Sequence, residues 1–188
     1  MRHGLLRSLK GVAAVLLASF FAGISISPTF AESAEAGLPI QEKAGTVLNG
    51  PGAADGYHLV AEKGGRKLYV MADSGAFEVR KENGSAVWKS SPDGIAEDEI
   101  AKGKNKLNLQ SLLVLQYGNP DSNTLDTVNS QTGSVLKDAT VVESIQDGFR
   151  VTYDFQSIKI RVPLEVTLTE SSLCVSVLSG GIEEYGEN

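Results

Sequence analysis

The chain has 188 residues, a mass of 19.9 kDa and a formal net charge of −6 at pH 7. Its ordinary composition, with 41% hydrophobic and 21% charged residues, excludes wholesale disorder, collagen and a coiled coil. A single cysteine excludes a disulfide scaffold and a zinc site built from several cysteines, and two histidines exclude most histidine-based metal chemistry.

The N-terminus has the three-part layout of a secretory signal peptide. A basic start over residues 2–10 precedes an uncharged apolar run over residues 11–26. The motif Thr29-Phe30-Ala31 then places small side chains at the −3 and −1 positions of a cleavage site. We predict a helical signal peptide over residues 1–31 that is cut between Ala31 and Glu32.

Cleavage is favoured over a membrane anchor because the apolar run of about 16 residues is shorter than the ~20 that a spanning helix needs. An alternative cut follows Ala36. Removing residues 1–31 removes three of the 17 basic residues and none of the 23 acidic ones, which leaves a net charge of −9. An acidic surface disfavours nucleic acid and anionic lipid. We therefore predict a secreted or cell-surface protein with no nucleic-acid partner and no membrane attachment after cleavage.

Residues 32–55 are rich in Ala, Gly, Glu and Pro and show no hydrophobic period, which predicts a flexible linker. From residue 57 to residue 89, alternating and fully apolar stretches predict a four-stranded meander. Its turns are expected at Gly64-Gly65, at Asp73-Ser74-Gly75 and at Asn83-Gly84. For the last we expect a type I′ turn, which needs positive φ at both central residues.

The middle of the chain is less regular. Residues 90–106 predict a short helix or an irregular excursion. Residues 107–117 are apolar on both parities, so a buried strand is favoured over a helix, because Gly118-Asn119-Pro120 stops the run sharply. Residues 118–134 are rich in turn formers, with a weak strand near 125–128.

The C-terminal third alternates clearly. Strands are expected at 141–145, 149–156, 158–168 and 173–177, with a second type I′ turn at Asp147-Gly148. Pro163 lacks an N–H for a ladder, so it implies a sheet edge or a bulge. Short strands with one apolar face predict an all-β antiparallel sandwich. We place this β-sandwich domain at residues 56–179 and a tail at 180–188.

The chemical candidates are few. The residues Asn119, Asp121, Asn123 and Asp126 resemble the start of a calcium loop, but Thr124 and Ser130 break the pattern at its glycine and glutamate positions, so a solvated turn is favoured. The acidic run Glu97-Asp98-Glu99 is interpreted as a charged loop rather than as the carboxylate pair of a glycosidase. His58 lies on the outward parity and no nucleophile motif accompanies it. We predict no catalytic residue, no metal and no cofactor.

Trp88 is the one candidate ligand-binding residue, because it follows a hairpin and an aromatic face can stack on a sugar ring. Core packing or an interface role competes with that hypothesis. Four tyrosines share the stacking chemistry, namely Tyr57, Tyr69, Tyr117 and Tyr153. Asn83-Gly84-Ser85 matches a glycosylation acceptor but is explained equally by the hairpin turn. Cys174 has no partner in the chain and is expected to be a buried small apolar residue.

Three stretches carry a resemblance to a known family. They read L-Y-V-M-A-D-S-G-A-F-E-V-R-K-E-N-G-S-A-V-W-K-S-S-P from residue 68, F-R-V-T-Y-D-F from residue 149, and I-R-V-P-L-E-V-T-L-T-E-S-S-L-C-V-S-V from residue 160. Together they resemble the N-terminal region of large secreted proteins of Gram-positive bacteria, a family of unknown function. There a galactose-mutarotase-like β-sandwich precedes a barrel similar to that of glycoside hydrolases.

The resemblance implies a supersandwich-like and incomplete fold, in a chain that continues past Asn188 into a barrel that is absent here. It carries over no catalytic residue, because catalytic carboxylates would lie in the barrel. The first hypothesis is therefore an exported non-catalytic module of a carbohydrate-related protein, with carbohydrate or the downstream barrel as partner. The alternatives are the N-terminal part of a glycoside hydrolase or mutarotase-like enzyme, and a cell-surface structural or adhesion protein.

Overall fold

The computed structural model describes residues 15–16, 44–118 and 124–186. The predicted cleavage point between Ala31 and Glu32 lies outside the described residues. Within the predicted signal segment, Val15–Leu16 forms a two-residue strand, β1, and not part of a helix. No helix among the described residues is long and apolar enough to cross a bilayer.

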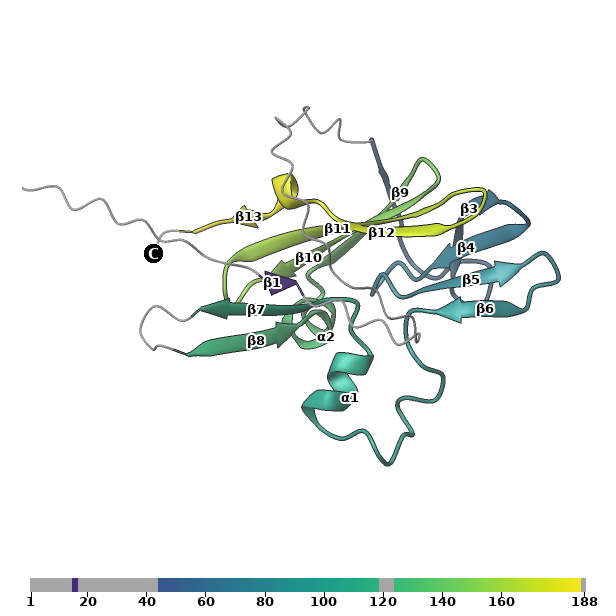
Figure 1. The fold of residues 1–188 in the computed structure, drawn as a ribbon. Helices are drawn as coiled ribbons and strands as arrows, with labels where there is room; N and C mark the ends of the chain where they lie inside the picture. Colours follow the sequence, from purple (N-terminus) through teal and green to yellow (C-terminus); the bar gives the residue numbers. More distant parts are fainter. Residues whose placement is uncertain (1–14, 17–43, 119–123, 187–188) are drawn as a thin grey trace, which may run out of the picture.

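The fold is all-β and antiparallel, as the alternation predicts, and it is built in two layers (Figure 1). The upper layer is one sheet with the order β12-β11-β10-β9-β2, to which β13 adds at β11. Its strands are β2 (Thr46–Val47), β9 (Thr140–Ile145), β10 (Gly148–Phe155), β11 (Ile160–Leu168), β12 (Leu173–Val177) and β13 (Glu183–Glu184).

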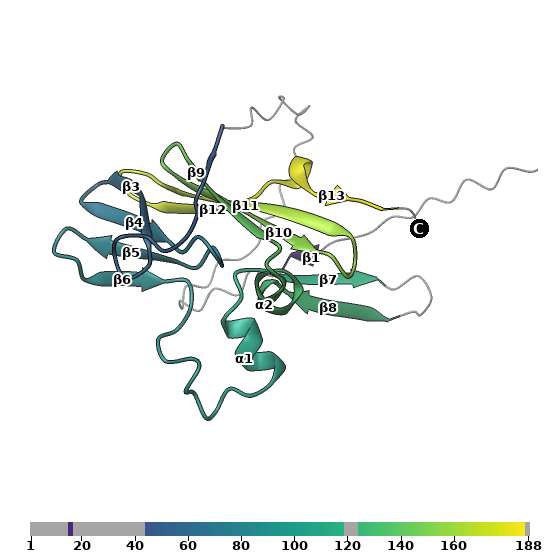
Figure 2. The same cartoon turned by 180° about the vertical axis from the view of Figure 1, so that it is seen from behind.

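The lower layer consists of two small sheets that lie side by side beneath the large sheet (Figures 1 and 2). One is the predicted meander, in the order β3-β4-β5-β6, and the other has the order β1-β7-β8. The meander contains β3 (His58–Lys63), β4 (Arg66–Val70), β5 (Phe77–Lys81) and β6 (Ala86–Lys89), and the second sheet contains β7 (Val114–Gly118) and β8 (Leu125–Asn129).

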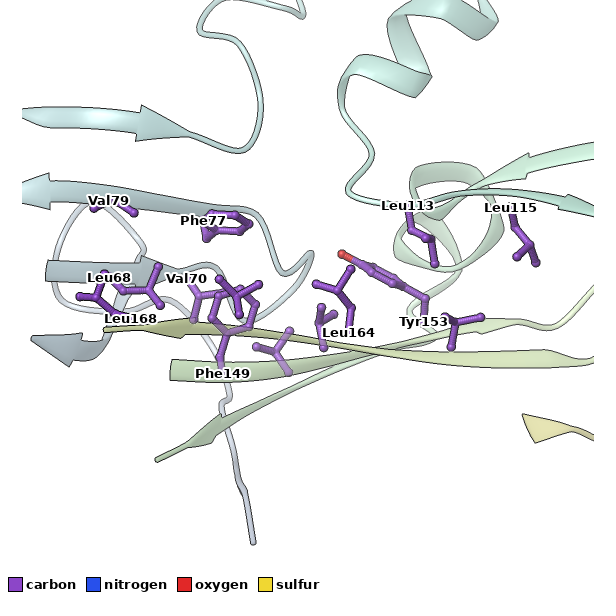
Figure 3. Close-up of a cluster of buried hydrophobic side chains, with 14 of the residues drawn as sticks. Leu68, Val70, Phe77, Val79, Leu113, Leu115, Phe149, Tyr153, Leu164 and Leu168 are labelled. Atoms are coloured by element: carbon purple, nitrogen blue, oxygen red, sulfur yellow. The ribbon is translucent and has the colours of Figure 1, made fainter. Parts of the chain in front are cut away.

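The core lies between the layers and follows the period of two that a strand imposes on its side chains. On β10, Phe149, Val151, Tyr153 and Phe155 are fully buried, while Thr152 and Asp154 point to the other face. Figure 3 shows that the meander covers one half of this surface and that residues at the start of β7 cover the other half. The meander contributes Leu68, Val70, Phe77 and Val79, and the β7 region contributes Leu113 and Leu115.

Tyr153 lies where the two small sheets meet (Figure 3). Its buried hydroxyl donates a hydrogen bond to the carbonyl oxygen of Ser74, in the turn between β4 and β5, at 2.9 Å. Gly75 follows with φ +73°, and a Cβ there would lie 2.8 Å from Val151 and 3.0 Å from the Tyr153 hydroxyl. Glycine is therefore needed at this turn both for its backbone conformation and for the close approach of β10.

The structure confirms the expectation for Pro163. On one side of β11, Pro163 is paired with Thr152 of β10. On the other side, β12 pairs only from Leu164 onward and β13 pairs only up to Arg161. Pro163 thus lies opposite the gap between β12 and β13. No neighbouring strand needs a hydrogen bond from its backbone nitrogen there, so proline is tolerated. Its carbonyl oxygen accepts a hydrogen bond from the amide of Leu178 at 3.2 Å.

The predicted buried strand over residues 107–117 is wrong in its first half. The short helix α1 (Lys104–Leu109) ends there, and β7 begins only at Val114. Leu113 and Leu115 reach the core from the extended part, while α1 has no buried residue. Because the apolar run contributes to both a helix and a strand, it has no single period from which the two elements could be told apart.

A further short helix, α2 (Ser130–Gly133), follows β8. It begins with a cap in which the Asn129 side chain accepts a hydrogen bond from the Thr132 amide.

Two turn predictions are also corrected. At Asn83-Gly84 only the glycine has positive φ, and at Asp147-Gly148 only the aspartate does, so neither is a type I′ turn. Positive φ at both residues occurs instead at Gly64-Gly65 and at Asp55-Gly56. The predicted flexible linker therefore contains a tight turn at its end. Earlier in the same segment, Thr46–Val47 pairs with β9.

Candidate functional site

The solvent-facing side of the meander carries the candidate site. Because Leu68, Val70, Phe77 and Val79 face the core, the residues between them on β4 and β5 must face outward. These outward residues meet others from β6 and from the segment before β3. We call the group the tyrosine–arginine cluster; it consists of Tyr57, Tyr69, Glu78, Arg80 and Lys89.

Arg80 is the centre of the tyrosine–arginine cluster. Its guanidinium carbon lies 4.6 Å from the ring centre of Tyr69 and 5.4 Å from that of Tyr57. Cation–π contact at these distances holds the planar guanidinium against the aromatic rings. Only 13% of the Arg80 side chain is exposed, so the rings and their neighbours remove most of it from water.

Glu78 pairs with both cations of the cluster. It is 7% exposed, accepts a hydrogen bond from Nε of Arg80 at 2.9 Å, and lies 3.4 Å from Nζ of Lys89. A buried carboxylate is tolerated only when it is paired in this way. Burial, and next the negative charge of Glu78, raise the pKa of the Tyr57 hydroxyl above its ordinary value.

Two exposed aspartates complete the charge pairing. Nζ of Lys89 lies 2.6 Å from Asp93, and this hydrogen bond is the main cause that raises the pKa of Lys89. Asp55 lies 3.6 Å from Arg80. Each cation of the cluster is therefore held between two carboxylates.

The segment before β3 brings Tyr57 and Asp55 over the sheet. Asp55 and Gly56 form its tight turn, closed by a hydrogen bond from the Tyr57 amide to the carbonyl oxygen of Ala54 at 2.8 Å. Nε2 of His58 lies 2.9 Å from the carbonyl oxygen of Gly50 and fixes the start of this segment. His58 therefore has a structural contact, and within residues 44–118 and 124–186 no hydrogen bond joins it to a nucleophile. The prediction that it lies on the outward parity is wrong, because His58 is paired with the core residue Val70.

The cluster also has an apolar surface. Leu59 is paired with Tyr69 in the register of β3 and β4 and is 50% exposed. Leu59 thus offers an exposed apolar side chain beside Tyr69, close to paired charges that can exchange hydrogen bonds with hydroxyl groups. The arrangement is suited to binding.

Trp88, the residue predicted to bind a ligand, lies on the other side of the meander. It is paired with Val79, a core residue, and its ring meets Phe77 edge-on with the ring centres 5.6 Å apart. It is 36% exposed because β6 is the outermost strand of the sheet. The structure thus gives Trp88 a packing contact, and ligand binding by its exposed part stays a prediction.

Sequence reasoning named Tyr57 and Tyr69 but missed Glu78 and Arg80. The alternation along the strand could have predicted them, because Glu78 and Arg80 alternate with the core residues Phe77 and Val79 and therefore share the outward face. Of the other predicted aromatic candidates, Tyr153 is fully buried in the core, and Tyr117 lies on β7, outside the cluster.

The predicted burial of Cys174 is wrong. The thiol is exposed, because Cys174 is paired with Thr167 on the outward parity of β12. The residues of this strand that pack against the core are Leu173, Val175 and Val177.

The acidic run is a loop, as expected. Asp98 accepts hydrogen bonds from the amides of Ala101 and Ile100, which lower the pKa of its carboxyl. Of the calcium-like residues, Asn119, Asp121 and Asn123 lie outside the described residues. Over residues 44–118 and 124–186, no three His, Cys, Asp or Glu side chains gather as metal ligands would.

A groove of about 460 Å³ is lined in part by Gly50, Pro51 and Gly56 of the segment that carries Tyr57. It opens where the chain leaves β2, and its lining includes Leu48, Met71 and Val142. Asp73 is the one charged residue of the lining. The lining of the groove contains none of the residues of the tyrosine–arginine cluster.

Comparison with protein-family models, with curated proteins and with solved structures gives no match for this chain.

Proposed function

We propose that the chain is the exported, non-catalytic β-sandwich module of a carbohydrate-related protein, and that the tyrosine–arginine cluster is its contact surface for polysaccharide. The observation that carries the proposal is the pair of tyrosine rings fixed by Arg80 beside the exposed Leu59. Rings that are already immobilised lose little conformational freedom when a ligand binds.

Export is supported by the basic start, the apolar run and the Thr29-Phe30-Ala31 motif. A non-catalytic role is supported by the pairing within the cluster. Each of the carboxylates of Glu78, Asp55 and Asp93 contacts a cation. A glycosidase instead needs one carboxylic acid that donates a proton and a second carboxylate across the sugar.

The proposal is tested by affinity electrophoresis of the secreted product in gels that contain soluble polysaccharides. We expect retarded migration in at least one gel, and Tyr69→Ala should weaken the retardation at least tenfold. The matched control is Tyr185→Ala, because the ring of Tyr185 also lies against an arginine, Arg161, at 4.4 Å, but outside the cluster. Circular dichroism of each variant shows whether it is folded.

Two results would overturn the proposal. If no polysaccharide retards the chain, or if Tyr185→Ala weakens binding as much as Tyr69→Ala, the cluster is not the contact surface. If incubation with a bound polysaccharide releases reducing ends, the module is an enzyme. Trp88→Leu in the same gels tests whether the exposed part of Trp88 adds to binding.

A further inference from the structure

We infer that the tyrosine–arginine cluster selects uncharged polysaccharide and rejects polymers that carry carboxylate, sulfate or phosphate groups. This inference rests on the proposed function and names the class of ligand for the same site. The reason is that carboxylates of the protein already pair with Arg80 and Lys89, the two cations of the cluster.

Arg80 is mostly covered and is already paired with two carboxylates of the protein. Arginine binds carboxylate or phosphate through the donors at the edge of its guanidinium plane. Here Nε donates to Glu78 at 2.9 Å and Nη1 lies 3.6 Å from Asp55. The guanidinium carbon lies over the rings of Tyr57 and Tyr69, and the side chain is 13% exposed. Glu78 already occupies Nε, and an anion that approached the Nη atoms would meet the negative charges of Glu78 and Asp55.

The neighbouring lysines are paired as well. Nζ of Lys89 lies 2.6 Å from Asp93 and 3.4 Å from Glu78. Lys67, at the far end of the same face, lies 3.5 Å from Glu62.

The charge of this face is negative. Three cations, Lys67, Arg80 and Lys89, meet four carboxylates, Asp55, Glu62, Glu78 and Asp93, which leaves a net charge of −1. The whole chain has a net charge of −6, and −9 after the predicted cleavage, so a polyanion is repelled at short and at long range.

The groups that remain available suit a neutral sugar. Leu59 is 50% exposed beside Tyr69 and offers an apolar surface for the C–H face of a ring. Asp55 and Asp93 have side chains that are 86% and 78% exposed, so their free oxygens can accept hydrogen bonds from sugar hydroxyls. Because no net charge is neutralised on binding, affinity should depend little on salt concentration.

The test uses pairs of polymers that share a backbone and differ in charge. These are dextran with dextran sulfate, hydroxyethyl cellulose with carboxymethyl cellulose, and methyl-esterified with de-esterified polygalacturonate. We expect the secreted chain to bind the neutral member of at least one pair, with less than a twofold change between 20 mM and 500 mM NaCl. Binding to its charged partner should be at least tenfold weaker.

Two variants test the cause. Asp93→Asn leaves the half-buried Lys89 with Glu78 as its single carboxylate partner in the cluster, and Glu78→Gln removes the charge from the centre of the cluster while keeping its size. Each should raise binding to the charged polymer at least threefold at low salt. Asp93→Asn alters a largely exposed residue and therefore gives an answer even if Glu78→Gln fails to fold.

The outcomes separate this inference from the proposed function. If a charged polymer binds as tightly as its neutral partner and Tyr69→Ala abolishes that binding, the cluster is a polysaccharide site but the selectivity is wrong. If neither variant raises binding to the charged polymer, charge pairing is not the cause of the selectivity and the inference is overturned. If no polymer of either kind binds, the proposed function fails as well.

Discussion

The meander and the large sheet each bury an arginine on their outer face, but they do so in different ways. On the large sheet, Arg150 is 8% exposed and lies 2.8 Å from Glu165 of β11 and 3.9 Å from Glu143 of β9. Both glutamates are the direct cross-strand partners of Arg150 in the register. On the meander, Arg80 is held by Glu78 of its own strand and by residues from the segment before β3.

The different surroundings of Arg150 and Arg80 suit different roles, stability for the first and the proposed binding for the second. Cross-strand pairs are the ordinary means by which a sheet stabilises its outer face, and the ladder of carboxylates and arginine on the large sheet needs no further explanation. The meander instead adds two tyrosine rings and an exposed leucine around its arginine. This difference is consistent with a structural role for Arg150 and supports the binding role that we propose for the surroundings of Arg80.

We expect the largest loss of stability from a substitution at the contact between the meander and the large sheet. The ring of Phe149 on β10 lies 5.6 Å, centre to centre, from that of Phe77 on β5, and Phe149 is fully buried. Phe149→Ala should lower the free energy of unfolding by about 4 kcal/mol, because it removes buried apolar surface and leaves a cavity. Urea unfolding followed by circular dichroism measures the loss. A loss below about 1 kcal/mol would contradict the two-layer core.

The next largest effect is expected from the two arginines, whose replacement by alanine should lower the free energy of unfolding by different amounts. Arg150→Ala leaves Glu165 and Glu143 without their common partner and should cost about 3 kcal/mol. Arg80→Ala should cost about 1.5 kcal/mol, because Glu78 keeps its contact with Lys89. The same urea experiment compares them. An equal or larger loss for Arg80→Ala would mean that the cluster serves stability first, and Arg150→Lys is the control that keeps the charge.

Tyr153→Phe should cost about 1 kcal/mol by removing the hydrogen bond to Ser74. The variant should also change the response to alkali. Burial raises the pKa of Tyr153 well above its ordinary value, so the folded chain keeps a proton that the unfolded chain loses near pH 10. The contribution to stability is therefore complete below about pH 10 and is lost as the pH rises further.

Thermal unfolding between pH 8 and pH 11 tests this. The melting temperature of the native chain should fall above about pH 10, and the fall should be smaller in Tyr153→Phe. Parallel curves for the two proteins would show that another group causes the alkaline loss.

The smallest effect on stability is expected at Leu59. It is 50% exposed, so Leu59→Ser should change the free energy of unfolding by less than about 0.5 kcal/mol. The same change should weaken polysaccharide binding several-fold, since Leu59 lies beside Tyr69. Leu136→Ser, at a residue that is 66% exposed and lies outside the meander, is the matched control and should leave binding unchanged. Equal effects of the two substitutions on binding would contradict a binding surface at Leu59.

The sequence by itself determined the all-β class and the strands of the C-terminal third, with the side of β10 and β11 that faces the core. The alternation over β10, β11 and β12 predicted the sheet correctly, and the lack of an N–H in Pro163 predicted the break in its neighbouring strands. These features are local, since the period of two and the chemistry of one residue are properties of the chain alone.

Only the tertiary structure decided which side chains meet. Arg80 and Tyr57 are brought together by a turn at Asp55-Gly56 inside a segment that the composition predicted to be flexible. Cys174 is exposed because the register of β12 on β11 turns it outward. Distances between segments far apart in sequence depend on packing, and a period read along one strand carries no information about what folds over it.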